Sequence, residues 1–412
     1  MENLLNKIRF DGDKIIWRII IFLSLFSILA IFSSSSRLAS MDSYRHSTYW
    51  YFIHRHLIFL VAGFVLMYIC HRIPISVYKN FATLSLVVSI GLLGYMLILG
   101  ETLNDGTRWI AIAGIRFQPI EVAKISVVLY LANILENNTF DDFKSVVRKI
   151  IIPIGTVCIL TFIAGTSMGL LLGIICISIL FIGGLRIKNL LKICGLAIAA
   201  LIILFTLGLT FHWPPRVVTA VNRIESFFGN DDNEKAVKES SNTQSDYAKM
   251  AVASGGLIGK GPGNSTQRHL LPHPYSDFVF AIIIEEYGLI IGALVLLAYM
   301  SLLYRAAIIA KKCTRIFSSV TVLGLMLMIV FQAMLNMGVS VGVFPVTGQT
   351  LPFISLGGTS ILCTGIALGT ILSVSRAANN QEISQQESNE KENEKHKVSD
   401  TKEKTIEYDD KQ

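Results

Sequence analysis

Apolar residues gather along this chain in ten runs of 17 to 26 residues, separated by polar segments. The runs cover residues 15–34, 55–71, 80–99, 118–135, 149–165, 167–185, 190–211, 277–302, 317–341 and 358–376. A hydrocarbon core about 30 Å thick is crossed by roughly 20 helical residues. We therefore predict an all-α, polytopic integral membrane protein with about ten transmembrane helices. The fifth and sixth runs meet at Gly165 and Thr166, so a count of nine, with that pair merged, is the alternative.

Composition supports a membrane protein and excludes several other classes. Of the 412 residues, 52% are hydrophobic and 16% are charged, and the mean hydropathy is +0.56. Soluble domains carry roughly a quarter charged residues, so a water-soluble enzyme, a disordered scaffold and a collagen-like fibre are excluded. The six cysteines show no C-x-x-C spacing, and we expect neither a metal cluster nor a disulfide framework. The first run lacks a small-residue cleavage site and is read as a helix, not as a cleavable signal.

The charge distribution predicts the orientation of the helices. The chain has a net charge of +7, yet the tail from Gln381 onward holds ten acidic residues against six lysines. The positive excess therefore lies in the loops. With the N-terminus inside, the short cytoplasmic loops hold fifteen Lys and Arg and the short outer loops hold five. This bias places both termini in the cytoplasm. We divide the chain into a transmembrane domain, residues 1–376, and an acidic cytoplasmic tail, residues 377–412, disordered by composition.

One outer loop, residues 212–276, is too long to be a simple connection between helices seven and eight. Apolar residues at helical spacing lie opposite polar ones near its start, which predicts an amphipathic helix on the outer leaflet. The apolar set is Val217, Val221, Ile224 and Phe228, and the polar set is Asn222, Arg223 and Glu225. The polar stretch from Gly229 to Gln244 is predicted to be mobile. The glycine-rich stretch from Ser254 to Ser265 is suited to tight turns.

The first group of polar residues that could carry chemistry flanks the start of the fourth helix. It comprises Asp105 to Trp109 and Gln118 to Lys124. Glu121 and Lys124 are three residues apart and can pair on one helix face. They could form a buried ion pair that orients helices. Alternatively, Arg108, Arg116 and Lys124 could form a cationic patch that faces an anionic ligand.

The second group opens the eighth helix, in the sequence from Leu271 to Phe280. Asp277 falls where water gives way to lipid. It could cap the helix N-terminus, or it could be a general base at the outer membrane face. Glu285 and Glu286 would lie roughly 12–14 Å deeper along a continuous helix. There they would form hydrogen bonds to other helices, with one or both carboxyls protonated, or bind a ligand.

The third group, from Pro345 to Ser360, is an irregular outer segment that contains Ser355 and leads into the tenth helix. Irregular backbone at this depth is tolerated only where it is buried in protein or lines a cavity, so the segment is either a structural turn or part of a site.

Other known catalytic and binding motifs do not match this sequence. Residues 255–260 lack the P-loop spacing, the histidines lack zinc-ligand spacing, and no Ser-x-x-Lys or Gly-x-Ser-x-Gly nucleophile is present.

These three groups, in this order on ten spans, closely resemble the SEDS family of bacterial membrane glycosyltransferases, whose FtsW branch acts in division and RodA branch in elongation. The resemblance runs from about Ile15 to Arg376, and LPHPYSDFVF, QPIEVAK and LPFISLGGTS are its most specific parts. GKGPGNS followed by LPHPYSDF is more similar to the FtsW branch. The sequence departs from the family at Gly165 to Gly169, where many members have Pro-Asp-x-Gly-Thr and this chain has no acidic residue.

The resemblance implies polymerisation of lipid II, an undecaprenyl-pyrophosphoryl disaccharide-pentapeptide, into glycan strands on the outer face of the inner membrane. By motif, Asp277 matches the essential loop aspartate, and Arg108, Glu121 and Lys124 match the polar cluster near the fourth helix. The secondary candidates are Gln118, Glu286, Ser355 and Ser360. A base must accept the proton of the attacking 4-hydroxyl, and Asp277 is expected to do so. Arg108, Lys124 and Arg268, with or without Mg²⁺ or Mn²⁺, would stabilise the leaving pyrophosphate. Inversion at the anomeric carbon is expected.

The implied partners are lipid II, a class B penicillin-binding protein with transpeptidase activity, other division proteins and membrane lipids, and no nucleic acid. The implied location is the bacterial inner membrane at the division septum. An elongation polymerase like RodA, a lipid II flippase and a scaffold that only recruits a transpeptidase are the alternatives. If the cationic patch is correct, Lys124→Ala abolishes activity without loss of expression.

Overall fold

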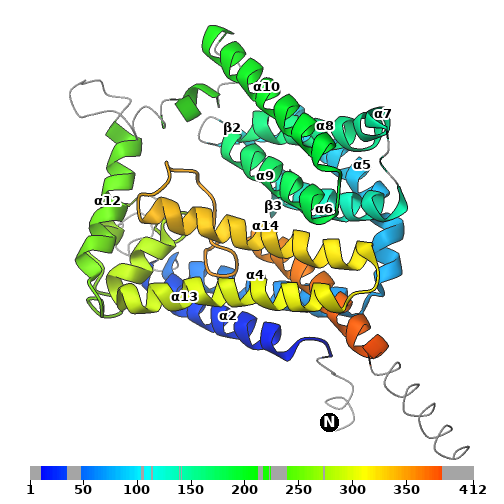
Figure 1. Ribbon diagram of the computed structural model, residues 1–412. Helices are drawn as coiled ribbons and strands as arrows, with labels where there is room; N and C mark the ends of the chain where they lie inside the picture. The colour runs from blue at the N-terminus through cyan, green and yellow to red at the C-terminus, as the bar shows by residue number, and fades with distance from the viewer. Residues whose placement is uncertain are drawn as a thin grey trace, which may run out of the picture.

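The protein is a bundle of apolar helices (Figure 1). The computed structural model describes residues 11–34, 48–103, 106–112, 115–138, 140, 142–211, 217–221, 223, 239–271 and 274–382. Each of the ten predicted runs falls on a helix. These are α2 (Lys14–Ser34), α4 (Thr48–Arg72), α5 (Ile75–Leu99), α6 (Pro119–Asn137), α8 (Ile152–Ala164), α9 (Thr166–Ile182), α10 (Ile187–Phe211), α13 (Val279–Lys312), α14 (Ile316–Ser340) and the C-terminal helix (Thr359–Glu382).

The exterior of the bundle is apolar, as a bilayer requires. Over the described residues, eight helices are long and apolar enough to cross a membrane. Of the other two, α9 is apolar but shorter, and α6 carries three charged residues. Large aliphatic side chains are exposed on the outside, among them Ile58, Ile98 and Ile187. Exposed apolar patches of this extent are rare on soluble proteins, and the chain is an integral membrane protein.

Helices α13 and α14 pack against each other at the centre (Figure 1). Helix α2 packs on α13, while α6 and α9 pack on α14, and α5 covers α6. Helix α10 lies at the edge of the bundle, and the side chains of its most apolar stretch are not buried. The buried side chains between these helices form one large hydrophobic core.

The fifth and sixth runs are two helices, so the alternative that merges them into one is wrong. A four-residue helix α7 (Phe143–Val146) and a π-helical segment (Val147–Ile151) lead into α8. The chain leaves the helical conformation at Gly165, with φ −169° and ψ 107°, and α9 starts at the next residue. The two helices pack closely because Gly169 has no side chain, and a Cβ there would lie 2.6 Å from Cα of Phe162.

The all-α prediction needs one addition, a small antiparallel sheet between α5 and α6. Its strands are β1 (Glu101–Leu103), β2 (Gly106–Ile112) and β3 (Ile115–Phe117), in the order β1–β2–β3. Trp109 on β2 pairs with Glu101, and Ala111 pairs with Arg116. Asp105, in the first predicted group, lies outside the described residues.

The long loop contains a helix that the sequence analysis did not predict. Helix α12 (Glu239–Gly255) includes residues 239–244, which were expected to be mobile. Helix α12 is polar on average but buries a stripe containing Ala248 and Ala251 against α13 and α14, with Tyr247 and Val252 partly buried beside them. This tertiary contact stabilises a helix that its own composition would not stabilise in isolation. Residues 217–221 and 223 of the predicted amphipathic helix are helical, and the rest of it lies outside the described residues.

Two helices extend beyond their predicted ends. Helix α13 continues past residue 302 to Lys312, and the C-terminal helix continues past residue 376 to Glu382. The two ends meet in an ion pair of 2.6 Å between Lys312 Nζ and Glu382 Oε2, beside a hydrogen bond from Thr314 to Gln381. Residues 383–412 of the predicted tail lie outside the described residues.

Helix α13 is broken at Gly288, and the glycine-rich loop fills the break. Gly288 has φ 84° and ψ 170°, a conformation essentially restricted to glycine. The amides of Lys260 and Gly261 bind the carbonyls of Glu285 and Glu286, each at 2.9 Å. In return, the amide of Leu289 binds the carbonyl of Gly256 at 3.0 Å. The loop thus supplies the hydrogen bonds that the helix loses at the break.

We expect Gly288→Ala to destabilise the protein by about 3 kcal/mol or more, because the strained backbone and a clash act together. A Cβ at this position would lie 2.2 Å from the carbonyl oxygen of Leu257. Thermal unfolding of the purified protein in detergent measures the change. Gly91→Ala is the control, because a Cβ at Gly91 in α5 has no neighbour within 4 Å. Equal unfolding temperatures for the two variants would contradict this account of the break.

Candidate active site

Asp277 lies in a turn that immediately precedes α13. The N-cap residue of α13 is Phe278, and no side chain caps the helix there, so Asp277 does not serve as the predicted N-cap. The hydroxyl of Ser276 donates to Oδ1 of Asp277 at 2.7 Å. Asp277 is partly exposed, whereas Phe278 beside it is buried. The carboxylate is therefore held at the edge of the core with a path to solvent.

Three hydrogen bonds from other segments fix the backbone of this turn. The amide of Leu356 donates to the carbonyl of Tyr275 at 3.0 Å, and the Ser355 hydroxyl donates to the carbonyl of Ser276 at 2.6 Å. The side-chain amide of Asn336, on α14, donates to the carbonyl of Asp277 at 2.8 Å. The position of the Asp277 carboxylate is therefore set by α14 and by the segment that follows it.

That segment belongs to the third predicted group, Pro345 to Ser360, whose last two residues begin the C-terminal helix. Its side chains also form hydrogen bonds within the segment. The hydroxyl of Ser355 accepts from the amide of Leu351 at 2.8 Å, and Ser360 is joined to Thr350 through their hydroxyls at 3.4 Å. Phe353 is buried and has φ 63°, a conformation that costs a non-glycine residue about 1–3 kcal/mol. The surrounding contacts hold this strained backbone in place, as is common beside functional sites.

Arg108, on β2, and Asp277 both lie beside Gly348 of this segment. A Cβ built on Gly348 would lie 3.5 Å from Oδ2 of Asp277 and 3.8 Å from Nη1 of Arg108. The guanidinium of Arg108 also covers Gly165 in the α8–α9 turn, and its Nε donates to the carbonyl of Ala164 at 3.4 Å. The turn that lacks the acidic residue of the family motif is thus part of this site, and Arg108 meets a backbone carbonyl there.

Arg223, from the long loop, adds a second guanidinium. Its Nη1 donates to the carbonyl of Val346 at 2.9 Å. Burial lowers the pKa of Arg223, and the negative charge of Asp277 opposes this by raising it. Arginine stays protonated in proteins, so two guanidinium groups and one carboxylate border the segment from Val346 to Gly348.

Glu121 and Lys124 form the buried ion pair that was one of their two interpretations. The Lys124 ammonium lies 2.9 Å from Oε1 of Glu121 and donates to Gln332 on α14 at 2.7 Å. Lys124 is 2% exposed, whereas Arg116 is exposed on β3. The structure therefore does not bring Arg108, Arg116 and Lys124 onto one cationic surface patch. Gln332 also donates to the carbonyl of Thr350 at 3.0 Å, which links the ion pair to the segment beside Asp277.

Gln118 is buried at the start of α6, where its side-chain amide lies 3.5 Å from the sulfur of Met168. Arg268 approaches Glu286, with Nη1 3.8 Å from Oε1, and donates to the carbonyl of Ser33 at 3.4 Å. Ser33, at the end of α2, also donates to Glu286 at 2.5 Å. These contacts make Arg268 and Glu286 a connection between the long loop, α2 and α13.

Glu285 forms a separate polar cluster with the glycine-rich loop. Its side chain is buried and accepts hydrogen bonds from Lys260 at 2.7 Å, Ser265 at 2.5 Å and the Thr266 hydroxyl at 2.9 Å. Both Glu285 and Glu286 therefore face protein, and their partners include cations. The described residues hold no group of three or more His, Cys, Asp and Glu that could bind a metal ion. Those residues therefore form no metal site built from protein ligands alone, and the chemistry below is written for the side chains.

Comparison with known proteins agrees with this arrangement of motifs. The family model of cell cycle proteins of the FtsW, RodA and SpoVE type matches residues 13–380. The chain belongs to this family. A relative in Coxiella burnetii, the probable peptidoglycan glycosyltransferase FtsW, is 31% identical over 374 residues, 88% of this chain and 96% of the relative. The stage V sporulation protein E of Bacillus subtilis is 30% identical over 370 residues, 88% of this chain and 97% of that protein.

Solved structures share the fold. A chain of a peptidoglycan synthase complex, described as coordinating polymerization and crosslinking, superposes with a TM-score of 0.69 and 23% identity over 89% of this chain and 98% of that one. The rod shape determining protein RodA of Thermus thermophilus superposes with a TM-score of 0.59 and 23% identity over 87% of this chain and 95% of that one. At this identity the likeness shows the fold alone, a polytopic helical membrane protein.

Sequence reasoning missed three residues of the site. Gln332 and Asn336 were interpreted as part of a plain apolar helix. Polar amides one turn apart inside a span nevertheless indicate a helix face that is buried in protein and forms hydrogen bonds there. Arg223 was noted only as the polar face of an amphipathic helix, and no spacing rule connects it to Asp277. The amides could have been found from the sequence, whereas Arg223 required the tertiary structure.

We expect Lys124→Met to destabilise the protein by about 3–5 kcal/mol, because Glu121 then stays buried without its counter-charge. The double variant Glu121→Gln/Lys124→Met should recover much of this loss. Thermal unfolding in detergent and expression level are the measurements. Lys249→Met is the control, because the Lys249–Asp246 pair is 46% and 56% exposed and contributes about 1 kcal/mol or less. A fully stable Lys124→Met would show that the pair does not support the bundle.

Proposed function

We propose that this protein is a peptidoglycan glycosyltransferase that polymerises lipid II into glycan strands at the outer face of the bacterial inner membrane during septal synthesis. The family match and the relatives named peptidoglycan glycosyltransferase support the reaction class. The observation that carries the assignment to this site is the convergence of Asp277, Arg108 and Arg223 on one short segment, Val346 to Gly348. A carboxylate beside two guanidinium groups is suited to proton transfer next to a pyrophosphate.

In this mechanism, the Asp277 carboxylate accepts the proton of the 4-hydroxyl of the incoming sugar. The hydroxyl oxygen attacks C1 of the second sugar, and the bond between C1 and the pyrophosphate oxygen breaks. The pyrophosphate leaves with the electron pair, and Arg108 and Arg223 stabilise the charge that develops on it. A single displacement inverts the anomeric carbon. Arg223 takes the part that the sequence analysis gave to Lys124 and Arg268, since those two cations have buried carboxylate partners.

The hydrogen bonds to the turn supply the preorganisation that a general base needs. Asn336, Ser355 and Leu356 bind the three carbonyls from Tyr275 to Asp277, so the carboxylate needs no rearrangement to meet its substrate. The substrate carries a lipid tail, which explains why such a site would lie at the end of a transmembrane bundle.

We propose that a class B penicillin-binding protein supplies the transpeptidase activity that crosslinks the product, together with other division proteins at the septum. The structural neighbour from a complex of polymerization and crosslinking supports a partner of this kind. Relatives named FtsW favour the division role over elongation. Depletion separates the two, because loss of a division polymerase gives filaments and loss of an elongation polymerase gives round cells.

We expect Asp277→Asn to lower lipid II polymerisation by about 100-fold or more, because the amide cannot accept the proton. Purified protein is given lipid II in detergent, and glycan polymer is measured on gels. Asp246→Asn is the control, since Asp246 is an exposed carboxylate on α12. Normal polymerisation by Asp277→Asn would exclude Asp277 as the base. Lipid movement across vesicles without any polymer would favour a flippase, and normal division with Asp277→Asn would favour a scaffold.

We also expect Arg223→Gln to reduce kcat by about tenfold or more with a smaller change in KM, because charge on the leaving group develops mainly in the transition state. Lys249→Gln removes an exposed positive charge from α12 and should leave polymerisation unchanged. A rise in KM at constant kcat would instead make Arg223 a residue for ground-state binding.

A further inference from the structure

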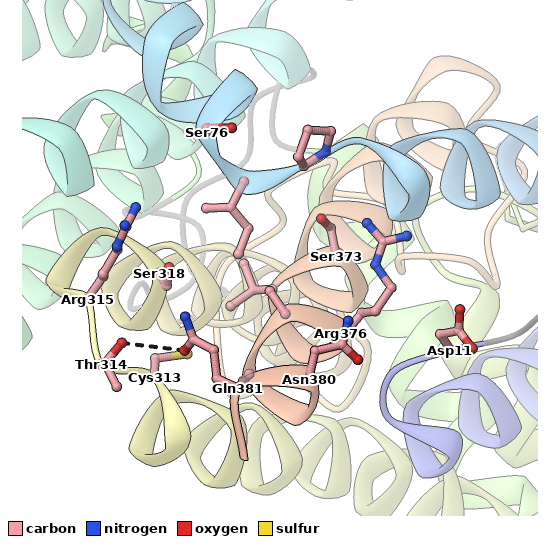
Figure 2. A pocket seen from close by; sticks show the side chains of 15 residues that line it. Asp11, Ser76, Cys313, Thr314, Arg315, Ser318, Ser373, Arg376, Asn380 and Gln381 are labelled. Carbon is pink, nitrogen blue, oxygen red and sulfur yellow. Dashed lines mark hydrogen bonds between the residues drawn. The ribbon is translucent and has the colours of Figure 1, made fainter. Parts of the chain in front are cut away.

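A cavity of about 510 Å³ opens at the end of the bundle remote from Asp277. It lies between the α4–α5 turn, the α13–α14 turn and the C-terminal helix (Figure 2). Helix α14 runs from this cavity, at Ser318, to Asn336 beside Asp277, a distance of roughly 27 Å at 1.5 Å per residue. The cavity therefore belongs to a different place from the proposed reaction site, and nothing in the mechanism uses it.

Two arginines, Arg315 and Arg376, stand on opposite sides of this cavity (Figure 2). Over the described residues, Arg315 makes no ion pair, and the guanidinium of Arg376 donates to a neutral group, the carbonyl of Arg72, at 3.2 Å. Asp11 is the single carboxylate that lines the cavity. By contrast, the nearby Lys312 meets a carboxylate, Glu382, at 2.6 Å. The cavity thus retains positive charge that its own walls do not neutralise.

Two long helices begin at this cavity, and neither N-terminus is capped by a side chain. Helix α5 starts after Pro74, and α14 starts after Arg315, each with 25 residues. The uncapped amides of a helix N-terminus and its macrodipole both favour an anion. Ser76 and Ser318, in the first turns of these helices, line the cavity. Hydroxyl groups of this kind donate to phosphate oxygens. Thr314 also lines it, and its hydroxyl donates to Gln381 at 3.4 Å.

The lining also includes apolar side chains, among them Ile75, Val374 and Ala378, beside the polar Ser373, Asn380 and Gln381, and the cavity lies where membrane-spanning helices end. An occupant must therefore combine negative charge and hydrogen-bond acceptors with an apolar portion. We propose that this cavity binds the phosphodiester headgroup of an anionic membrane phospholipid. Basic pockets between transmembrane helices at the membrane surface take such headgroups, and the positive charge, donors and apolar contacts here match one. This site is independent of the proposed catalytic function.

The test uses the full-length protein, delipidated in detergent and titrated by native mass spectrometry with phosphatidylglycerol, phosphatidylcholine or inorganic phosphate. Wild-type protein should bind phosphatidylglycerol about tenfold or more tightly than phosphatidylcholine. The double variant Arg315→Gln/Arg376→Gln should lose this preference. Lys188→Gln/Lys311→Gln removes the same charge from exposed positions outside the cavity and should keep it.

A second variant, Ala377→Trp, fills the cavity without removing charge and should weaken phosphatidylglycerol binding as well. Thermal unfolding confirms that each variant is folded, and lipid II polymerisation, measured separately, reports on the reaction site. Equal loss of preference in both charge variants would overturn the proposal, because binding would then follow general surface charge. Competition by inorganic phosphate alone, at the same concentration as the lipid, would also overturn it in favour of a free phosphate site.

Discussion

In a bilayer, irregular backbone has no water to satisfy its amides and carbonyls, so it persists only where other groups supply the partners. Helix α14 supplies them here. Asn336 binds the carbonyls of Asp277 and Gln349, and one turn earlier Gln332 binds the carbonyl of Thr350 and the ammonium of Lys124. Two side-chain amides on one helix face thus hold two irregular segments and a buried ion pair. The geometry around Asp277 depends on these contacts.

The same constraint explains the break in α13. A helix interrupted inside the bundle must have its freed carbonyls and amides bound by something, and the loop from Gly255 to Gly261 does this. The loop is also tied through Lys260 to Glu285, while Arg268 is tied to Glu286 and to the end of α2. The long loop is therefore anchored in the helical core at Glu285 and Glu286, about two helical turns along α13 from Asp277. The two adjacent carboxylates of α13 serve that anchoring.

The basic side chains of the bundle differ in the partners that they meet. Lys124, Lys260 and Arg268 each meet a buried carboxylate, which offsets the cost of removing them from water. Arg108 and Arg223 donate to backbone carbonyls and lie near the partly exposed Asp277. These two guanidinium groups and one carboxylate therefore share one border of the segment from Val346 to Gly348, at the edge of the core.

The sequence by itself determined that the ten apolar runs are helices, because a long apolar segment must satisfy its own backbone hydrogen bonds. It also pointed to Asp277 and to the segment from Pro345 to Ser360 through their motifs. It left open whether Lys124 was a ligand or half of an ion pair. Only the tertiary structure decided this, since Gln332 approaches from a helix 208 residues away. Helix α12, the break at Gly288 and the place of Arg223 likewise depend on contacts between distant segments. The periodicity of a sequence predicts which face of a helix is apolar, but it does not predict which distant segment packs against that face.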